Sequence, residues 1–294
     1  MLNIFKHYTS YIIICLCTLC ALPSATASNT ATTIAADKNI TLGIYGSDRK
    51  AVINRKFLPL VKYIEKHLRE KTGEPFKIKL VYYDTYEDGI NAIVNGEVDI
   101  ARLGPVSYVK AKDKNPDLSI VAIEANNGKK SFQGVICVKK DSNIYSLEDI
   151  KGKTFAFGNR HSTSGRYLAQ KHLYTHGIKA SHLAEHTYFS KHGDVAFSLV
   201  QSEYDAGSFK DVILKNRLLA RSLRVVSTFP VITHPWVANS NISPSTKNSL
   251  TDVLLNIKNK KVFDGLKRNG FLAGDDSEYE DIRDAINMNH LFYN

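Results

Sequence analysis

From Asn39 onward, short apolar runs alternate with segments in which apolar residues recur every three or four positions. The first pattern is typical of buried strands and the second of amphipathic helices. Together they predict strands at 40–45, 76–83 and 98–103, and helices that run through 57–68 to Gly73, from about Tyr86 to Gly96, and from Pro105 onward. Strands and helices that alternate in this way form parallel sheets whose faces are covered by helices.

A second unit of the same kind begins near Phe132. The same patterns predict strands at 154–157, 204–207 and 223–228, and helices at 166–177, 192–203 and 212–219. The chain is then helical from Pro244, with Ser243 as the N-terminal cap. Two α/β units followed by a helical return predict a bilobed α/β protein with a ligand cleft between the lobes.

The N-terminal segment has the pattern of a secretory signal peptide. Lys6 precedes a mostly apolar run at 11–22 that is too short to span a bilayer, and an Ala-x-Ala site follows at 25–27. Cys20 allows lipoprotein processing as the alternative, although the bulky Leu19 before it disfavours that route. We therefore expect export to the periplasm.

These patterns divide the chain into five parts. They are a signal peptide at 1–27, a disordered leader at 28–38, a first lobe at 39–131, a second lobe at 132–234 and a return at 235–294 that ends in helices. Three of the four cysteines lie in the signal peptide, so Cys137 remains alone in an apolar run and no internal disulfide can form.

The formal net charge of +10 allows three classes of partner: nucleic acid, an anionic membrane or a small anion. No block of arginine and lysine with interleaved aromatic residues is present, so we expect no nucleic acid partner. No apolar segment of 18 residues follows the signal peptide, so we expect no further membrane span.

The segment 158–165, Gly-Asn-Arg-His-Ser-Thr-Ser-Gly, lies between a predicted strand and a predicted helix. The start of a helix has free backbone N–H groups and the positive end of the helix dipole, and both favour an anion. The hydroxyls of Ser162, Thr163 and Ser164 add further donors. The alternative is that Ser162 or Ser164 only caps the helix.

Two functions other than anion binding are conceivable, namely catalysis and metal binding. Ser162 or Ser164 could form a hydrolytic triad with His192 and Asp205, but the chain lacks a Gly-x-Ser-x-Gly nucleophile turn. Metal binding is suggested by histidines at helical spacing, namely His172 with His176 and His182 with His186, but no carboxylate-rich partner accompanies them. We expect neither catalysis nor a metal or cofactor.

Four motifs, in this order, resemble those of the periplasmic solute-binding proteins of phosphate, phosphite and phosphonate ABC importers. Tyr86 stands in a segment similar to the family's D-Y-x-x-x-I motif, and 96–108 is similar to its G-x-V-D-I-A-x-x-G-P-x-S-Y motif. The loop 162–165 matches the family's S-T-S-G, and His192 matches the histidine of its H-x-x-A…V-D-A motif.

The resemblance implies a type 2 periplasmic-binding-protein fold, with two mixed sheets, flanking helices and a hinge. It also implies a monomer that binds a small oxyanion and delivers it to an ABC permease in the inner membrane. A module that reports the ligand to a membrane sensor is an alternative that the sequence does not separate from import. The residues that would bind the phosphonyl group are Ser162, Thr163, Ser164, His192 and Tyr86.

Departures from the family pattern concern the rest of the ligand. The family's aminoalkylphosphonate binders have a tyrosine at the position of Phe132. They have acids at the positions that correspond to Val212 and His234. The basic residues Arg102, Arg160 and His161 stand where the family usually has neutral or acidic ones. We therefore expect Phe132, Arg102 and His234 to line the site, and a fully anionic ligand that binds more tightly as histidines become protonated at lower pH.

Overall fold

The computed structural model describes residues 38–46 and 49–294. The predicted signal peptide, its alternative processing at Cys20 and almost all of the predicted leader lie outside these residues. Lys38, the last residue assigned to the leader, already belongs to the first strand. Within the described part of the chain, no helix combines the length and the apolar character needed to cross a membrane.

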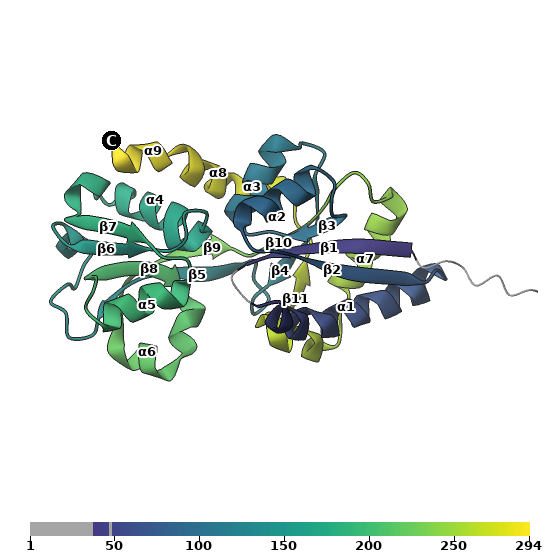
Figure 1. Cartoon of the computed structure of the whole chain (residues 1–294), viewed down its shortest axis with the longest axis horizontal. Coiled ribbons are helices and arrows are strands. Elements are labelled where there is room, and N and C mark those ends of the chain that lie inside the picture. The colour runs from purple at the N-terminus through teal and green to yellow at the C-terminus, as the bar shows by residue number, and fades with distance from the viewer. Residues whose placement is uncertain (1–37, 47–48) are drawn as a thin grey trace, which may run out of the picture. The chain divides into compact units, whose positions relative to one another are not determined.

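Strands and helices alternate through most of the described chain (Figure 1). The strands are β1 Lys38–Tyr45, β2 Phe76–Tyr83, β3 Ile100–Arg102, β4 Ser119–Ala125, β5 Ser131–Lys139, β6 Thr154–Phe157, β7 Glu185–Tyr188, β8 Ala206–Lys210, β9 Leu223–Ile232, β10 Pro235–Ala238 and β11 Gly270–Leu272. The α-helices are α1 Lys50–Thr72, α2 Tyr86–Val94, α3 Pro105–Lys114, α4 Leu168–Thr175, α5 His192–Val200, α6 Arg217–Ser222, α7 Pro244–Leu255, α8 Glu280–Asn287 and α9 Asn289–Tyr293.

The first lobe is built on a six-stranded mixed sheet in the order β11-β4-β10-β3-β1-β2. β1 is parallel to β2 and β3, whereas β10 is antiparallel to β3 and β4. α1 covers one face of this sheet, and α2 and α3 cover the other (Figure 1). The apolar stripe of α1, which includes Leu60 and Ile64, is fully buried, and the helix ends at Gly73 in the left-handed conformation.

The second lobe is built on a five-stranded mixed sheet in the order β7-β6-β8-β5-β9. β6 is parallel to β7 and β8, and β5 is antiparallel to β8 and β9. α4 lies on one face, and α5 and α6 lie on the other (Figure 1). The predicted fold of two lobes with mixed sheets and flanking helices is thus confirmed.

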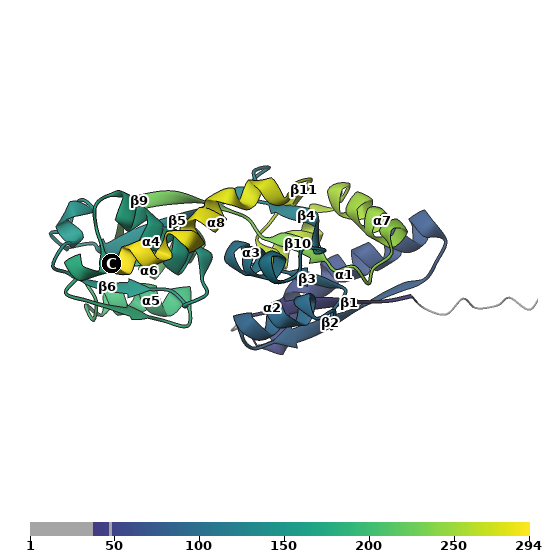
Figure 2. The same ribbon diagram turned by 90° about the horizontal axis from the view of Figure 1, so that it is seen from above.

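The chain beyond residue 234 contributes to both lobes. β10 and β11 complete the first sheet, and α7 packs against α1. α8 lies between α3 of the first lobe and α4 of the second, and α9 packs against α4 (Figure 2). Lys171 of α4 pairs with Asp281 of α8 at 2.7 Å, and the Gln170 amide donates to the Tyr293 hydroxyl at 2.9 Å. The division of the chain at 131 and 234 stays a prediction.

Several predicted elements differ from those observed. The strand predicted at 204–207 lies at β8, two residues later, because Asp205 bonds to Thr154 beside the sheet and Tyr204 packs against Phe189. The helix predicted at 212–219 is interrupted, since the Asn216 side chain accepts from the Leu218 N–H and starts α6 there. The sequence patterns also missed the strands β4 and β5 and the short strands β7, β10 and β11.

Candidate functional site

A cavity of about 1000 Å³ opens where parallel strands of both sheets end. In the first lobe its lining follows the carboxyl ends of β1, β2 and β3, and in the second lobe those of β6, β7 and β8. Loops and helix N-termini gather at this edge of parallel sheets, which is why α/β proteins bind ligands there. Phe132 reaches the cavity from the start of β5 in the second sheet, and His234 reaches it from the connection between β9 and β10.

The hydroxyl-rich loop leaves β6 through a close approach of two glycines. The Gly158 N–H donates to the Gly165 carbonyl at 2.7 Å, and a Cβ on Gly165 would lie only 2.8 Å from the Gly158 Cα. The Ser208 hydroxyl of β8 donates to the same carbonyl at 2.9 Å. Only glycine fits at 165, so the loop is held in one conformation by the backbone.

Ser162 caps the turn that follows, which confirms the capping interpretation for this residue. Its Oγ accepts from the Gly165 N–H at 3.0 Å. The turn at Thr163–Tyr167 is π-helical, and α4 begins only at Leu168, so the predicted helix at 166–177 starts later and ends earlier than expected. Ser162 also lines the cavity, and its hydroxyl proton remains free to donate into it.

Thr163 and Ser164 differ in their surroundings. Thr163 lines the cavity, and its Oγ1 accepts from the Val106 N–H at 3.0 Å, at the start of α3 in the first lobe. Ser164 is fully buried and is not part of the cavity lining. Among the described residues no group bonds its Oγ. The loop therefore joins the lobes through Thr163 and keeps an unused hydroxyl at Ser164.

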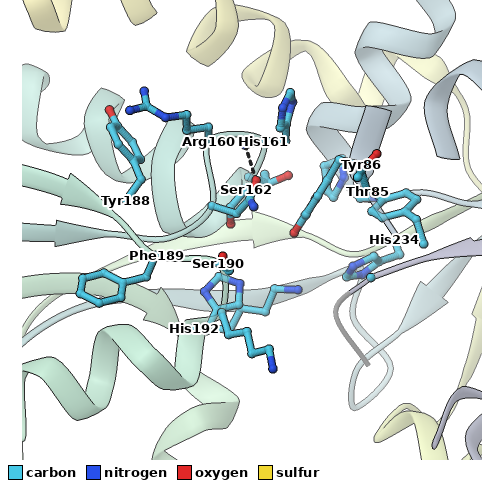
Figure 3. Close-up of a pocket in the computed structure, with 18 of the residues that line it drawn as sticks. Thr85, Tyr86, Arg160, His161, Ser162, Tyr188, Phe189, Ser190, His192 and His234 are labelled. Atoms are coloured by element: carbon cyan, nitrogen blue, oxygen red, sulfur yellow. Dashed lines mark hydrogen bonds between the residues drawn. The ribbon is translucent and has the colours of Figure 1, made fainter. Parts of the chain in front are cut away.

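His192 starts α5 and lines the cavity opposite this loop. In Figure 3, Ser162 lies between Tyr86 and Tyr188, and the His192 ring lies below Ser162. Its Nδ1 is buried and has no hydrogen-bond partner in the described part of the chain. Burial, and then the charge of Lys210, lower the pKa of His192 to about 3. The imidazole is thus neutral and can donate one hydrogen bond.

We expect the ring resonances of His192 to show no titration between pH 5 and 8 in the protein without ligand. NMR spectra recorded across this range, with His192→Gln to assign the signals, measure this directly. A midpoint inside the range would contradict the burial argument. Because the unfolded chain binds this proton near pH 6.5 and the folded chain does not, His192 also lowers the stability of the fold as the pH falls below that value.

Aromatic residues of both lobes form one wall of the cavity. Tyr86, the first residue of α2, stacks against His161 of the loop at a ring distance of 5.8 Å. Burial raises the pKa of Tyr86 above its usual range, so its hydroxyl stays protonated. In the second lobe, the Arg160 guanidinium lies 4.3 Å from the centre of the Tyr188 ring. Tyr86 thus lies beside the hydroxyl-rich loop, and its role in binding a ligand stays a prediction.

A buried carboxylate, Glu124 on β4, organises the basic residues behind the cavity. Arg102 forms two hydrogen bonds to it, at 2.5 and 2.9 Å, and the Arg268 Nε donates at 3.2 Å. Burial alone would raise the pKa of Glu124, but the two guanidiniums hold it below its ordinary value. Arg102 lines the cavity as expected, yet its guanidinium is already paired with Glu124.

His234 and Phe132 stack on each other at 6.4 Å where the two sheets connect. Burial, and then the charges of Arg102 and Lys210, hold the pKa of His234 well below its ordinary value. The expectation that His234 becomes charged as the pH falls is therefore wrong for the protein without ligand. The physical reasons are the burial of the imidazole first and the charges of the neighbouring cations second.

Lys210, which the sequence analysis missed, lines the cavity at the end of β8. Burial, and then the charges of Arg102 and Arg268, lower its pKa to about 8. Its position at the carboxyl end of a parallel strand is the sequence signal that could have found it. Val212, in contrast, is not part of the cavity lining, which passes through Ile213 instead.

The arrangement of these residues matches neither the hydrolytic triad nor the histidine metal site. Asp205 bonds the backbone and hydroxyl of Thr154 at 2.9 Å, at the opposite ends of β8 and β6 from the cavity, so it cannot complete a triad with His192. His172 bonds Ser227 at 2.8 Å. In residues 38–46 and 49–294, no three His, Cys, Asp or Glu side chains are grouped to hold a metal.

Comparison with known proteins places this site in context. A family model described as the periplasmic substrate-binding protein of a phosphonate ABC transporter matches residues 42–279. The probable ABC transporter phosphite binding protein PhnD1 of Prochlorococcus marinus is 23% identical, over 84% of this chain and 88% of its own length. The phosphonates-binding periplasmic protein of Escherichia coli is 24% identical, over 84% and 75%.

Solved structures show the same fold. The structure of PhnD1 from Prochlorococcus marinus in complex with methylphosphonate superimposes with a TM-score of 0.72, at 21% identity over 84% of this chain and 97% of that one. A binding protein component of an ABC phosphonate transporter from Pseudomonas aeruginosa gives 0.72, at 24% identity over 87% of both chains.

Members of this family are substrate-binding proteins that work with a membrane permease. The match extends from β1 to the turn before α8 and so includes both lobes and the whole cavity lining. The chain therefore belongs to the family of periplasmic substrate-binding proteins of ABC phosphonate transporters.

Proposed function

We propose that this protein captures a small phosphorus oxyanion (phosphate, phosphite or an alkylphosphonate) in its cavity and delivers it to the permease of an ABC importer. The observation that carries the proposal is the Ser-Thr-Ser loop at the edge of the cavity. The hydroxyls of Ser162 and Thr163 line the cavity at the start of a helical segment, together with a neutral histidine and a protonated tyrosine of the cavity wall. Each of these groups can donate a hydrogen bond to the acceptor oxygens of a phosphonyl group, and the hydroxyls can also accept from a P–OH group.

The anion would join the two lobes. Ser162, Thr163 and His192 belong to the second lobe, and Tyr86 belongs to the first. Thr163 already accepts from the start of α3 across the lobes, at 3.0 Å. Bound ligand would add bonds to both sides of this contact, so the lobes would close on it as hinged clamps do. A closed, ligand-bound form is what a permease would select.

Export by cleavage of the signal peptide at 1–27, action as a monomer and a permease in the inner membrane belong to the same proposal. Relatives that carry phosphite-, phosphate- and phosphonate-binding names support it. Neither the sensing role nor metal binding has an observation in the described residues that favours it. The cavity offers no nucleophile with an adjacent oriented base, so the proposal includes no catalytic step.

We expect Thr163→Ala to weaken methylphosphonate binding about tenfold or more. Hydrogen bonds to charged groups are worth about 1.5–3 kcal/mol, and about 1.4 kcal/mol corresponds to a factor of ten. Isothermal titration calorimetry of the protein without its signal peptide measures the change. Thr175→Ala is the matched control, because that hydroxyl bonds only within α4 and the residue that follows it.

The same titrations include phosphate and phosphite. Tight binding of one of the three by the unmodified protein, with a loss in Thr163→Ala and none in Thr175→Ala, supports the proposal. Absence of binding to all three anions would contradict it. Equal affinities of Thr163→Ala and the unmodified protein would leave the loop as a helix cap only.

A further inference from the structure

Basic residues gather at one side of the cavity, near Lys210. Arg102, Arg268 and Lys210 surround the carboxylate of Glu124, and of these Arg102 and Lys210 line the cavity. Glu124 is 1% exposed, and its two oxygens are bonded by the two arginines. The described ion pairs give Lys210 no carboxylate partner, and its ammonium lies over the Phe132 ring at 5.7 Å.

Other charges do not offset this cation. Glu124 and Asp211 both attract this ammonium, but each acts on it more weakly than either arginine, and neither is part of the cavity lining. The acids that do line the cavity, Asp84 and Glu87, are exposed and flank Tyr86 on the first lobe. The cavity surface near Lys210 and His234 is therefore positive and lacks a counter-charge.

His234 adds an unsatisfied polar atom at the same place. It is 7% exposed and lines the cavity. Its Nδ1 lies 3.8 Å from a Glu124 oxygen, too far for a hydrogen bond, and has no other partner among the described residues. Buried polar atoms of this kind are normally satisfied, so a ligand group is a natural partner.

Lys210 and the hydroxyl-rich loop at 162–165 line the same cavity, but they lie at the ends of different strands. The loop follows β6, and Lys210 ends the neighbouring parallel strand β8. The cavity volume of about 1000 Å³ is at the upper end of the range for small-molecule sites and exceeds the space that a methylphosphonate fills. Room therefore remains beside an anion that is bound at the loop.

We propose that Lys210 and His234 form a second subsite that binds a negatively charged substituent on the ligand, so that the preferred ligand is a phosphonate carrying a second anionic group such as a carboxylate. The inference rests on the proposed function, because it places the phosphonyl group at the Ser-Thr-Ser loop. It also accounts for the hydrophobic Phe132 beside Lys210, which would contact the carbon chain between the two charged ends.

The test compares two ligands of the same length, phosphonoacetate and its neutral amide phosphonoacetamide. Calorimetric titrations give their affinity ratio for the unmodified protein, for Lys210→Met and for Lys191→Met. Lys191 lines the same cavity but is exposed, so it reports the effect of net charge alone. We expect the unmodified protein to prefer phosphonoacetate at least tenfold, and Lys210→Met to lose that preference while Lys191→Met keeps it.

The outcomes separate this inference from the proposed function. If methylphosphonate and phosphonoacetamide bind but phosphonoacetate binds no better, the subsite is overturned and the proposed function stands. If Lys210→Met and Lys191→Met change the ratio equally, long-range charge accounts for it and the subsite is also overturned. If none of these phosphonates binds, both fail. Tight binding of 2-aminoethylphosphonate would likewise overturn the subsite, because its ammonium would face Lys210.

Discussion

Replacing Glu124 by glutamine is expected to lower the free energy of unfolding by about 3–5 kcal/mol, because it leaves buried guanidiniums without their counter-charge. Arg102 and Arg268 both bond this carboxylate, and the Trp236 indole donates to it at 3.3 Å. Glutamine keeps the shape of the side chain, so the loss reports the charge rather than a cavity. Urea unfolding followed by circular dichroism measures it.

Glu148→Gln is the matched control for this substitution. Glu148 pairs with Lys151 at 2.6 Å on the surface, where both side chains are exposed, and such pairs contribute about 0–1 kcal/mol. Equal losses of stability in the two variants would show that Glu124 is not the centre of a buried ion network.

The effect of Glu124 also has a defined pH dependence. Its pKa in the folded protein is below the ordinary value of 4.5, so the carboxylate stabilises the fold fully at neutral pH. This stabilisation begins to fall as the pH drops below 4.5 and is lost below the folded pKa. The difference in stability between the unmodified protein and Glu124→Gln should therefore shrink in acid. A constant difference down to pH 3 would contradict the assigned pKa direction.

Gly165→Ala is expected to weaken methylphosphonate binding about a hundredfold or more. An added Cβ would lie 2.8 Å from the Gly158 Cα and 3.1 Å from its nitrogen, so the loop must shift. A shift misplaces at least two donors, and each hydrogen bond to a charged group is worth about 1.5–3 kcal/mol. Calorimetry measures the loss, and circular dichroism verifies that the variant is folded.

Gly193→Ala serves as the control, since Gly193 lines the same cavity and a Cβ there meets no atom within 4 Å. Its affinity should remain within about threefold, because added bulk without a clash leaves the donors in place. If Gly165→Ala binds as tightly as Gly193→Ala, the loop geometry does not determine the affinity.

The loop at 162–165 was predictable because its information is local. Small hydroxyl residues after an apolar strand and before an amphipathic helix define a helix start whatever the rest of the fold does. The resemblance then placed His192 and Tyr86 beside the same ligand, and both line the cavity. The positions where prediction failed, such as β7 and the broken helix after β8, depend on half-buried polar residues and on single side-chain bonds.

The basic cluster was not predictable in the same way. Arg102 and Glu124 meet because β10 is inserted antiparallel between β3 and β4. Arg268 comes from the segment before β11, and Lys210 comes from β8 of the second sheet, so the four residues belong to segments far apart in the chain. Charge counts could not tell which arginine is already paired and which cation is left without a partner. For the same reason, the low pKa values of His192 and His234 could not be read from the sequence.

By itself, the sequence determined the two α/β lobes and the hydroxyl-rich loop, because periodicity and helix-start chemistry act over a few neighbouring residues. The tertiary structure alone decided which charges remain unpaired at the cavity and that the last helices contact both lobes. Pairing and desolvation depend on distances between segments that are remote in sequence, and those distances exist only once both sheets are assembled.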